Sequence, residues 1–196
     1  MQPKRIAVKF FAAPDPAAAV DLHPFLGIFH RFIQKGVLPG LLLDVADYAH
    51  VPEGPGVILI GHDVDYGIDL AGGRTGLLTT RKRLESTPVG VSLIDTLRRS
   101  LAALAALAAE PESKLRFATQ FFHLDLLDRL AAPNDEAGFA AARDAIAPAL
   151  DQLYGAGAWK ASRASDSDLR KPLALRVELQ AALPLESLAA RLRQEG

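Results

Sequence analysis

The chain alternates between segments with a two-residue hydrophobic period and segments with a helical one. Apolar residues occupy every second position of residues 5–11 and again of residues 173–179, which is typical of strands with one buried face. The apolar runs at residues 41–46 and 57–60 are short and bordered by Pro or Gly, so they predict buried strands. Strand-like alternation returns at residues 114–124.

Helical spacing fills the regions between these strands. Apolar residues recur at intervals of three and four in residues 22–33 and 87–110, and each stripe predicts an amphipathic helix. A third helix is expected from Asn134, a good N-cap, to about residue 153, with Pro148 kinking it or splitting it in two. A short fourth helix is expected over residues 184–194.

One further signal completes the expected fold. Residues 66–70 and 75–81 flank the pair Gly72-Gly73, which predicts a β-hairpin because glycine tolerates the positive φ of a tight turn. The order β-α-β-β-β-β-α-β-α-β-α predicts the α+β class, with a single mixed or antiparallel sheet and helices mainly on one face. A ferredoxin-like core with an added hairpin is one arrangement that meets this order. No linker divides the chain, so we expect one domain over residues 1–196.

Composition narrows the choice of partners and compartment. The net charge of −1 gives no bulk attraction to nucleic acid or to an anionic membrane, and we expect neither as a partner. There are no cysteines, which excludes disulfides, thiolate nucleophiles and Cys-ligated zinc. The N-terminus lacks the apolar core of a signal peptide, and no apolar run is long enough to span a bilayer. We therefore expect a cytoplasmic protein.

Acidic and imidazole side chains follow two of the predicted strands. They are Asp44, Asp47 and His50 after the second strand, and His62, Asp63, Asp65 and Asp69 after the third. If these strands are neighbours, the groups gather at one sheet edge. We take His62, Asp63 and Asp65 as candidate catalytic residues, because such groups bind divalent metals or act as an acid/base pair. The alternative is turn chemistry, since Asp beside Gly commonly caps local backbone N–H groups.

A glycine turn offers a candidate anion site. Gly72, Gly73 and Arg74 combine backbone N–H groups that can cradle an anion with a guanidinium that can bind it in a bidentate way. With His50 they are the candidate ligand-binding residues. Neither the Walker pattern nor the dinucleotide-binding fingerprint is present, and a simple hairpin turn is the alternative. His123 continues the predicted inward side of its strand, which indicates a core or rim histidine.

Three segments carry a resemblance to other proteins. They are IFHRFIQ (residues 28–34), GVILIGHDVDY (56–66) and GRTGLLTTRKR (73–83). In this first half the chain resembles an uncharacterised family of bacterial proteins. The resemblance implies a bacterial cytosolic setting and supplies no activity or site residues.

Two hypotheses of function follow. The preferred one is a non-enzymatic module that binds a ligand or another protein, because no recognised catalytic motif is present. Under it, a homodimer is expected through an exposed sheet edge or through the long Ala/Leu-rich helix. The alternative is a metal-assisted enzyme that acts on an anionic or phosphorylated small molecule, with Arg74 holding the anion. The sequence identifies neither a cofactor nor a metal.

Overall fold

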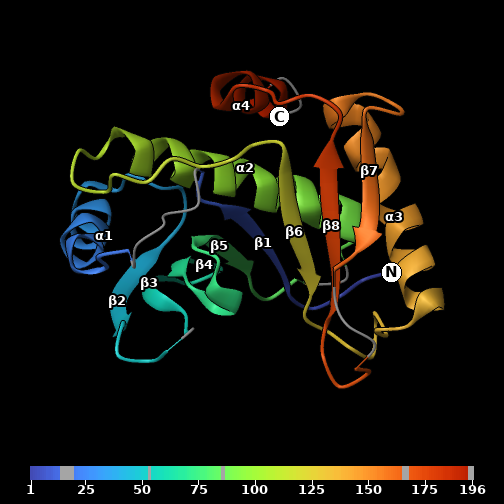
Figure 1. The fold of residues 1–196 in the computed structure, drawn as a ribbon, viewed down its shortest axis with the longest axis horizontal. Coiled ribbons are helices and arrows are strands. Elements are labelled where there is room, and N and C mark those ends of the chain that lie inside the picture. The colour runs from blue at the N-terminus through green and yellow to red at the C-terminus, as the bar shows by residue number, and fades with distance from the viewer. Residues whose placement is uncertain (14–19, 53, 85–86, 165–167, 194–196) are drawn as a thin grey trace.

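The structure is a computed structural model that describes residues 1–13, 20–52, 54–84, 87–164 and 168–193. In these residues it contains eight strands and four α-helices (Figure 1). The strands are β1 (Ile6–Phe11), β2 (Leu42–Tyr48), β3 (Gly56–Gly61), β4 (Val64–Asp69), β5 (Gly76–Arg81), β6 (Phe121–Leu126), β7 (Trp159–Arg163) and β8 (Leu173–Leu179). The helices are α1 (His23–Lys35), α2 (Val89–Ala109), α3 (Glu136–Tyr154) and α4 (Leu185–Arg193), with a short 3₁₀ turn η1 (Ala71–Gly73).

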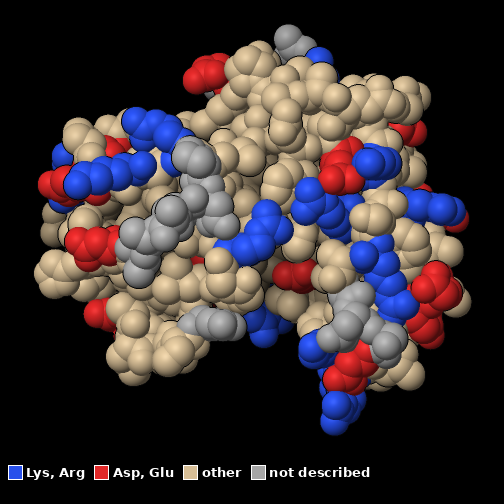
Figure 2. Space-filling model, viewed as in Figure 1, with Lys and Arg blue, Asp and Glu red and all other residues tan. Residues whose placement is uncertain are grey.

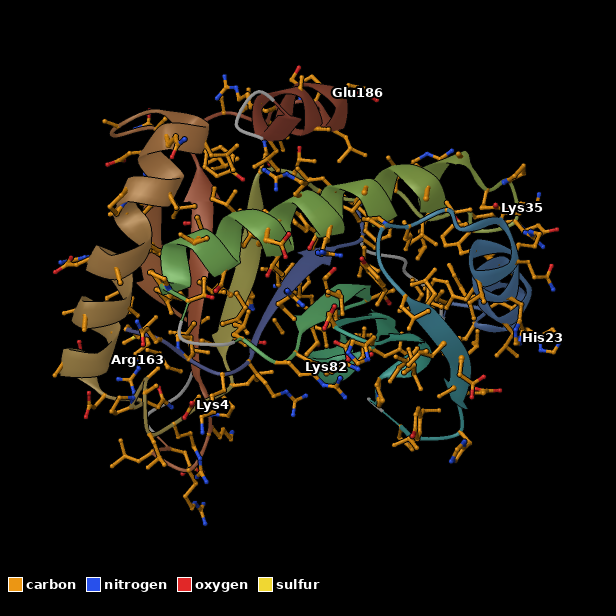
Figure 3. The ribbon with its side chains drawn as sticks, turned by 180° about the vertical axis from the view of Figure 1, so that it is seen from behind. Lys4, His23, Lys35, Lys82, Arg163 and Glu186 are labelled. Atoms are coloured by element: carbon orange, nitrogen blue, oxygen red, sulfur yellow. The ribbon has the colours of Figure 1, made fainter. Side chains whose placement is uncertain are left out.

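All eight strands belong to one sheet, in the order β2-β3-β4-β5-β1-β6-β8-β7. Each pairing between these described strands is antiparallel. Helices α1, α2 and α3 cover one face of the sheet, and α4 packs on α2 and α3 (Figure 3). The fold is therefore the predicted α+β class with a single antiparallel sheet and helices on one face.

The central strands have a ferredoxin-like order. Helix α2 joins β5 to β6, and both strands pair antiparallel with β1, which lies between them. Strands β1 and β4 likewise both pair with β5, and α1 lies in the segment that joins them. Two interlocked split βαβ units of this kind form a ferredoxin-like core. The hairpin β2–β3 is inserted after α1. Beyond β6 the sheet is extended by β8 and β7, and α3 and α4 belong to the same C-terminal part of the chain.

The hydrophobic core lies between the sheet and the helices. On β1, Ile6, Val8 and Phe10 are fully buried, as their two-residue period predicts. Their cross-strand partners on β5 and β6 point to the same face. Helix α2 buries the stripe that includes Leu97 and Leu104 against the sheet and the other helices, at about 1.5–3 kcal/mol for each large side chain. Because this stripe is used within the chain, the apolar face of the Ala/Leu-rich helix is not available to a dimer partner.

Several predicted boundaries are corrected by tertiary contacts. The predicted strands do not include β7, because its polar, Ser-rich surroundings give no strand signal; its pairing with β8 makes it a strand. Helix α3 runs unbroken through Pro148, and its N-cap is Asp135, whose carboxylate accepts a bond of 2.7 Å from Gly138 N. Of the predicted strand at residues 114–124, only the last part belongs to β6. None of the described helices is long and apolar enough to cross a membrane.

Candidate functional site

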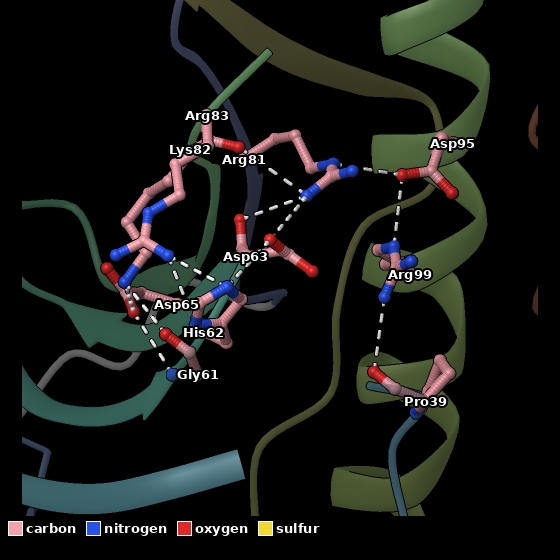
Figure 4. Close-up of polar contacts among 10 residues, drawn as sticks. All are labelled: Pro39, Gly61, His62, Asp63, Asp65, Arg81, Lys82, Arg83, Asp95 and Arg99. Atoms are coloured by element: carbon pink, nitrogen blue, oxygen red, sulfur yellow. Dashed lines mark hydrogen bonds and ion pairs between the residues drawn. The ribbon is translucent and has the colours of Figure 1, made fainter. Parts of the chain in front are cut away.

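Two of the predicted catalytic residues, His62 in the turn between β3 and β4 and Asp65 at the start of β4, already have partners (Figure 4). Lys82 Nζ donates to the Asp65 carboxylate at 2.7 Å and to the Gly61 carbonyl at 2.8 Å. The His62 ring lies beside Arg83, with 2.8 Å between Nε2 and a guanidinium nitrogen. The side chains that were expected to bind a metal or move protons, Asp65 and His62, therefore already contact Lys82 and Arg83. Both of these basic residues lie just beyond the end of β5.

The third predicted catalytic residue, Asp63, belongs to a network that ties the end of β5 to α2. Arg81 donates to the Asp63 carbonyl at 3.2 Å and pairs with the Asp95 carboxylate at 3.2 Å. Arg99 contacts the same Asp95 carboxylate at 3.0 Å and donates to the Pro39 carbonyl at 3.1 Å (Figure 4). Partly exposed ion pairs of this kind contribute up to about 1 kcal/mol each. These contacts hold the end of β5 against α2, which is a structural role.

The predicted anion turn lies at the opposite end of β4. Gly72 and Gly73 adopt φ of 70° and 65°, which favours glycine, and the N–H of Gly73 donates to the Leu70 carbonyl at 3.1 Å. The six residues of β4 separate this turn from His62, a distance of about 20 Å at the usual strand rise. Gly73 thus bonds within the turn, and Arg74 remains as the anion-binding candidate there.

The expected gathering of all these groups at one sheet edge is wrong. Strands β2 and β3 are neighbours, but they pair antiparallel, with Leu42 opposite Gly61 and Tyr48 opposite Gly56. The end of β2 therefore meets the start of β3, and the exposed His50 lies far from His62. Among the described residues, no group of three or more His, Asp or Glu side chains is placed to hold a metal ion.

A different set of polar and aromatic side chains gathers on the face of the sheet that none of the described helices covers. We call it the helix-free cluster. It consists of Lys9, Phe11, Asp69, Arg74, Phe121, His123, Asp125 and Arg176. Figure 2 shows Lys and Arg side chains gathered over the middle of this face, in the region of β6 and β8, with acidic side chains beside them. The cluster brings together residues from five separate segments of the chain.

Strand register creates this cluster. Lys9 of β1 lies directly opposite His123 of β6, which in turn lies opposite Arg176 of β8. Directly opposed residues of an antiparallel pair project to the same face. The adjacent row carries Phe11 and Phe121, whose rings stack at 5.3 Å. The pleat therefore places a basic and imidazole row beside an aromatic row.

A buried ion pair forms one border of the cluster. The Lys9 ammonium bonds to the Asp69 carboxylate of β4, with the two residues 7% and 6% exposed. Strand β5 lies between β1 and β4, and its Gly76 is opposite Phe11 on one side and Asp69 on the other. A Cβ at Gly76 would be 3.0 Å from Lys9 Cε and 2.4 Å from the Phe10 carbonyl oxygen, so a side chain there has no space. The missing side chain lets Lys9 cross β5 to reach Asp69.

Among the described residues, Arg74 is the cation of the cluster without an acidic partner. Its guanidinium lies 4.0 Å from the centre of the Phe11 ring and 5.4 Å from that of Phe121. It makes no hydrogen bond or ion pair with any described residue. Arg176 also stacks on Phe121 at 4.0 Å, but it pairs with Glu178 at 2.9 Å. Stacking on a ring fixes Arg74 in place while its N–H donors stay available.

The two titratable groups of β6 in this cluster have strongly shifted pKa values. Burial, with lesser effects from Arg176, Arg74 and Lys9, lowers the pKa of His123 to about 4. Burial raises the pKa of Asp125 to about 6, with Lys9 opposing the shift. Neither side chain bonds to another described residue. Unpaired groups with shifted pKa values concentrate at functional sites, which favours this cluster as the candidate site.

Sequence reasoning found Arg74 and missed most of the rest. It placed His123 on the inward side of its strand, but the buried residues of β6 are Phe122, Leu124 and Leu126, so His123 faces away from the helices. The available signal was the opposite parity, with Phe121, His123 and Asp125 sharing one face.

The molecule is thus an α+β domain with a ferredoxin-like core and a cluster of cationic and aromatic side chains on the helix-free face of its sheet. Comparison with known proteins found no family model that matches the chain and no curated protein that is similar to it. The resemblance to a bacterial family therefore stays a prediction.

Proposed function

We propose that this protein is a binding module that holds a small anionic molecule on the helix-free face of its sheet. The proposal depends on one observation, the position of the Arg74 guanidinium and its lack of an acidic partner among the described residues. Its guanidinium is fixed on Phe11 at 4.0 Å and has no acidic partner among the described residues. Guanidinium groups bind carboxylate and phosphoryl oxygens through paired N–H donors. Restricting the side chain before the ligand arrives lowers the entropy lost on binding.

The surroundings of Arg74 favour a negative ligand. Lys9 and Arg176 lie in the same cluster and raise the local positive potential, although each has a carboxylate partner. His123 is neutral near pH 7, because its pKa is lowered to about 4, and can donate or accept a hydrogen bond. Two arginines, one lysine and one imidazole suit an anion with several oxygens, such as a phosphate monoester or a dicarboxylate.

The aromatic rings support a small anion over single-stranded nucleic acid. Sheet surfaces that bind RNA present open rings on which bases stack. Here Phe11 is only 4% exposed, and guanidinium groups lie over both Phe11 and Phe121. A base would first have to displace these cations.

Calorimetry on three variants tests the proposal. The full chain is titrated with inorganic sulfate, inorganic phosphate and citrate, with glucose as an uncharged control. Arg74→Ala should weaken anion binding about 10- to 100-fold, the effect of losing hydrogen bonds to a charged group. Arg74→Lys keeps the charge but loses the planar fork, so we expect an intermediate loss.

Arg143→Ala is the matched control, because Arg143 is an exposed arginine on α3 that pairs with Asp144. It removes the same charge away from the cluster, and binding should change less than twofold. Equal losses in Arg74→Ala and Arg143→Ala would mean that the anion responds only to net charge, which contradicts the proposal. Absence of any anion binding by the unmodified chain would also contradict it.

The edge strand β2 favours a second function, self-association. In the described sheet β2 pairs only with β3, so its outer backbone groups have no strand partner. Leu41 and Leu43 are 62% and 52% exposed at this edge, and Tyr48 is also exposed. A second copy that pairs its own β2 antiparallel across a twofold axis would cover these residues. Light scattering on a size-exclusion column should then give a dimer mass that Leu43→Lys converts to a monomer; a monomer at high concentration would contradict this.

A further inference from the structure

We infer that His123 is a second ligand-binding residue of the helix-free cluster and that it takes up a proton when the anion binds. This inference rests on the proposed binding of an anion at Arg74. It adds a specific residue and a form of regulation to that site, because proton uptake makes binding stronger as the pH falls.

Geometry places His123 next to Arg74. The His123 ring packs edge-on against Phe11, with 4.8 Å between ring centres, and the Arg74 guanidinium lies over that same Phe11 ring at 4.0 Å. Both side chains are partly exposed. The imidazole makes no hydrogen bond to a described residue. An oxyanion held by Arg74 therefore lies close to an imidazole whose nitrogens need partners.

Cations surround His123 on three sides. Lys9 faces it from β1, Arg176 from β8 and Arg74 from the turn before β5. Burial, and after it these charges, disfavours a further positive charge and keeps the pKa of His123 near 4. In the free protein the imidazole is therefore neutral at pH 5.5 and above.

The nearby carboxylates do not balance these cations for His123. The Asp69 carboxylate pairs with Lys9, and the Glu178 carboxylate pairs with Arg176 and Lys160. Asp125 lies two residues further on the same face of β6, with a pKa raised to about 6, so it is mostly protonated at pH 5.5. The described acidic groups thus leave the field at His123 positive.

Binding of an anion reverses this balance. The ligand's negative charge offsets the three cations and gives His123 an acceptor, so the protonated imidazole becomes the favoured form. Linkage then requires affinity to rise as protons become available. If one proton is taken up per anion, affinity rises by up to about tenfold for each pH unit between 6.5 and 4.5.

Proton uptake can be measured directly with inorganic sulfate, which does not itself titrate in this range. Calorimetry at pH 5.5 in two buffers of different ionisation enthalpy should report uptake of about one proton per sulfate by the unmodified chain. His123→Gln, which keeps a neutral hydrogen-bonding side chain, should bind sulfate with uptake close to zero. Asp125→Asn removes the other group of the cluster that could take up the proton, and uptake that persists in this variant is carried by His123.

A spectroscopic readout separates this role from a structural one. The chain has five histidines, so imidazole C–H signals can be followed by proton NMR and assigned with His123→Gln. The His123 signal should titrate near pH 4 in the free protein and at least two pH units higher with saturating sulfate.

The possible results distinguish this inference from the proposed function. Arg74-dependent sulfate binding without proton uptake, or with uptake that persists in His123→Gln, would overturn the inference and leave the anion site standing. Loss of uptake in Asp125→Asn alone would assign the proton to Asp125 and also overturn it. Absence of Arg74-dependent binding would overturn both.

Discussion

Burial of Asp125 lowers the free energy of unfolding near neutral pH, and this loss can be measured. Burial raises its pKa from 3.8 to about 6, so the folded chain prefers the protonated acid. Below pH 4 the acid is protonated in both the folded and unfolded states and there is no penalty. As the pH rises from about 4 to 6, the contribution of Asp125 lowers the stability of the folded state relative to the unfolded state. A shift of about two pKa units corresponds to about 3 kcal/mol above pH 6.

Replacing Asp125 by Asn removes this penalty while keeping the shape of the side chain. We expect Asp125→Asn to raise the free energy of unfolding at pH 7.5 by up to about 3 kcal/mol, or Tm by about 6–12 °C for a chain of this size. At pH 4 the variant and the unmodified chain should unfold alike. Urea denaturation followed by circular dichroism at pH 4, 5, 6 and 7.5 measures the difference.

Asp144→Asn, which removes an exposed carboxylate on α3, is the control for this experiment. Its free energy of unfolding should stay within about 0.5 kcal/mol of the unmodified value at each pH. An Asp125→Asn variant that is destabilised at pH 7.5, or stabilised equally at pH 4 and 7.5, would refute the reasoning.

Four further predictions concern the same face of the sheet and the β3–β4 turn. His123→Gln should remove an opposing pH dependence, because the lowered pKa of His123 makes stability fall as the pH drops from 6.5 to 4; its urea midpoint, unlike that of the unmodified chain, should decline steadily from pH 4 to 6. Lys9→Met should destabilise by about 3–5 kcal/mol by leaving Asp69 buried without a partner, and Lys9→Met/Asp69→Leu should recover most of the loss; no recovery in denaturation would contradict this. Gly76→Ala should lower the free energy of unfolding by about 1–3 kcal/mol through overpacking against β1, and a neutral result would contradict the crowding. Asp65→Asn should leave sulfate affinity within twofold in calorimetry, since it lies at the other end of β4; a tenfold loss would return the site to the β3–β4 turn.

Most of the fold could be predicted from the sequence, because the local hydrophobic pattern of each element agrees with its tertiary contacts. Alternation on β1 and β8 and the stripes of α1 and α2 follow directly from burying one face of each element. Strand β7 was missed because only its pairing with β8 makes it extended. No local pattern distinguishes such a segment from a loop.

Only part of the candidate site could be predicted from the sequence, because the rest depends on the direction and register of strand pairing. His50 and His62 follow successive strands, but whether such residues meet depends on the pairing direction, and antiparallel pairing sends them to opposite ends. Lys9 and His123 are far apart in sequence, and only the register of β1 with β6 brings them together. Arg74 could be singled out because glycine turns followed by arginine are a local signal for an anion.

The shifted groups also bear on function. A half-buried carboxyl such as Asp125, which bonds to no described residue, weakens the folded state near pH 7, as worked out above. Groups of this kind persist where activity uses them, so that stability is traded for function. The Lys9–Asp69 pair on the same face is buried without adding to the hydrophobic core.

The most direct test of the central claim is a comparison of sulfate binding by Arg74→Ala and Arg143→Ala in the full chain at pH 5.5. The account predicts that the first variant loses 10- to 100-fold in affinity and the second less than twofold. Equal affinities in the two variants, or no binding by the unmodified chain, would contradict the claim that the helix-free face binds an anion.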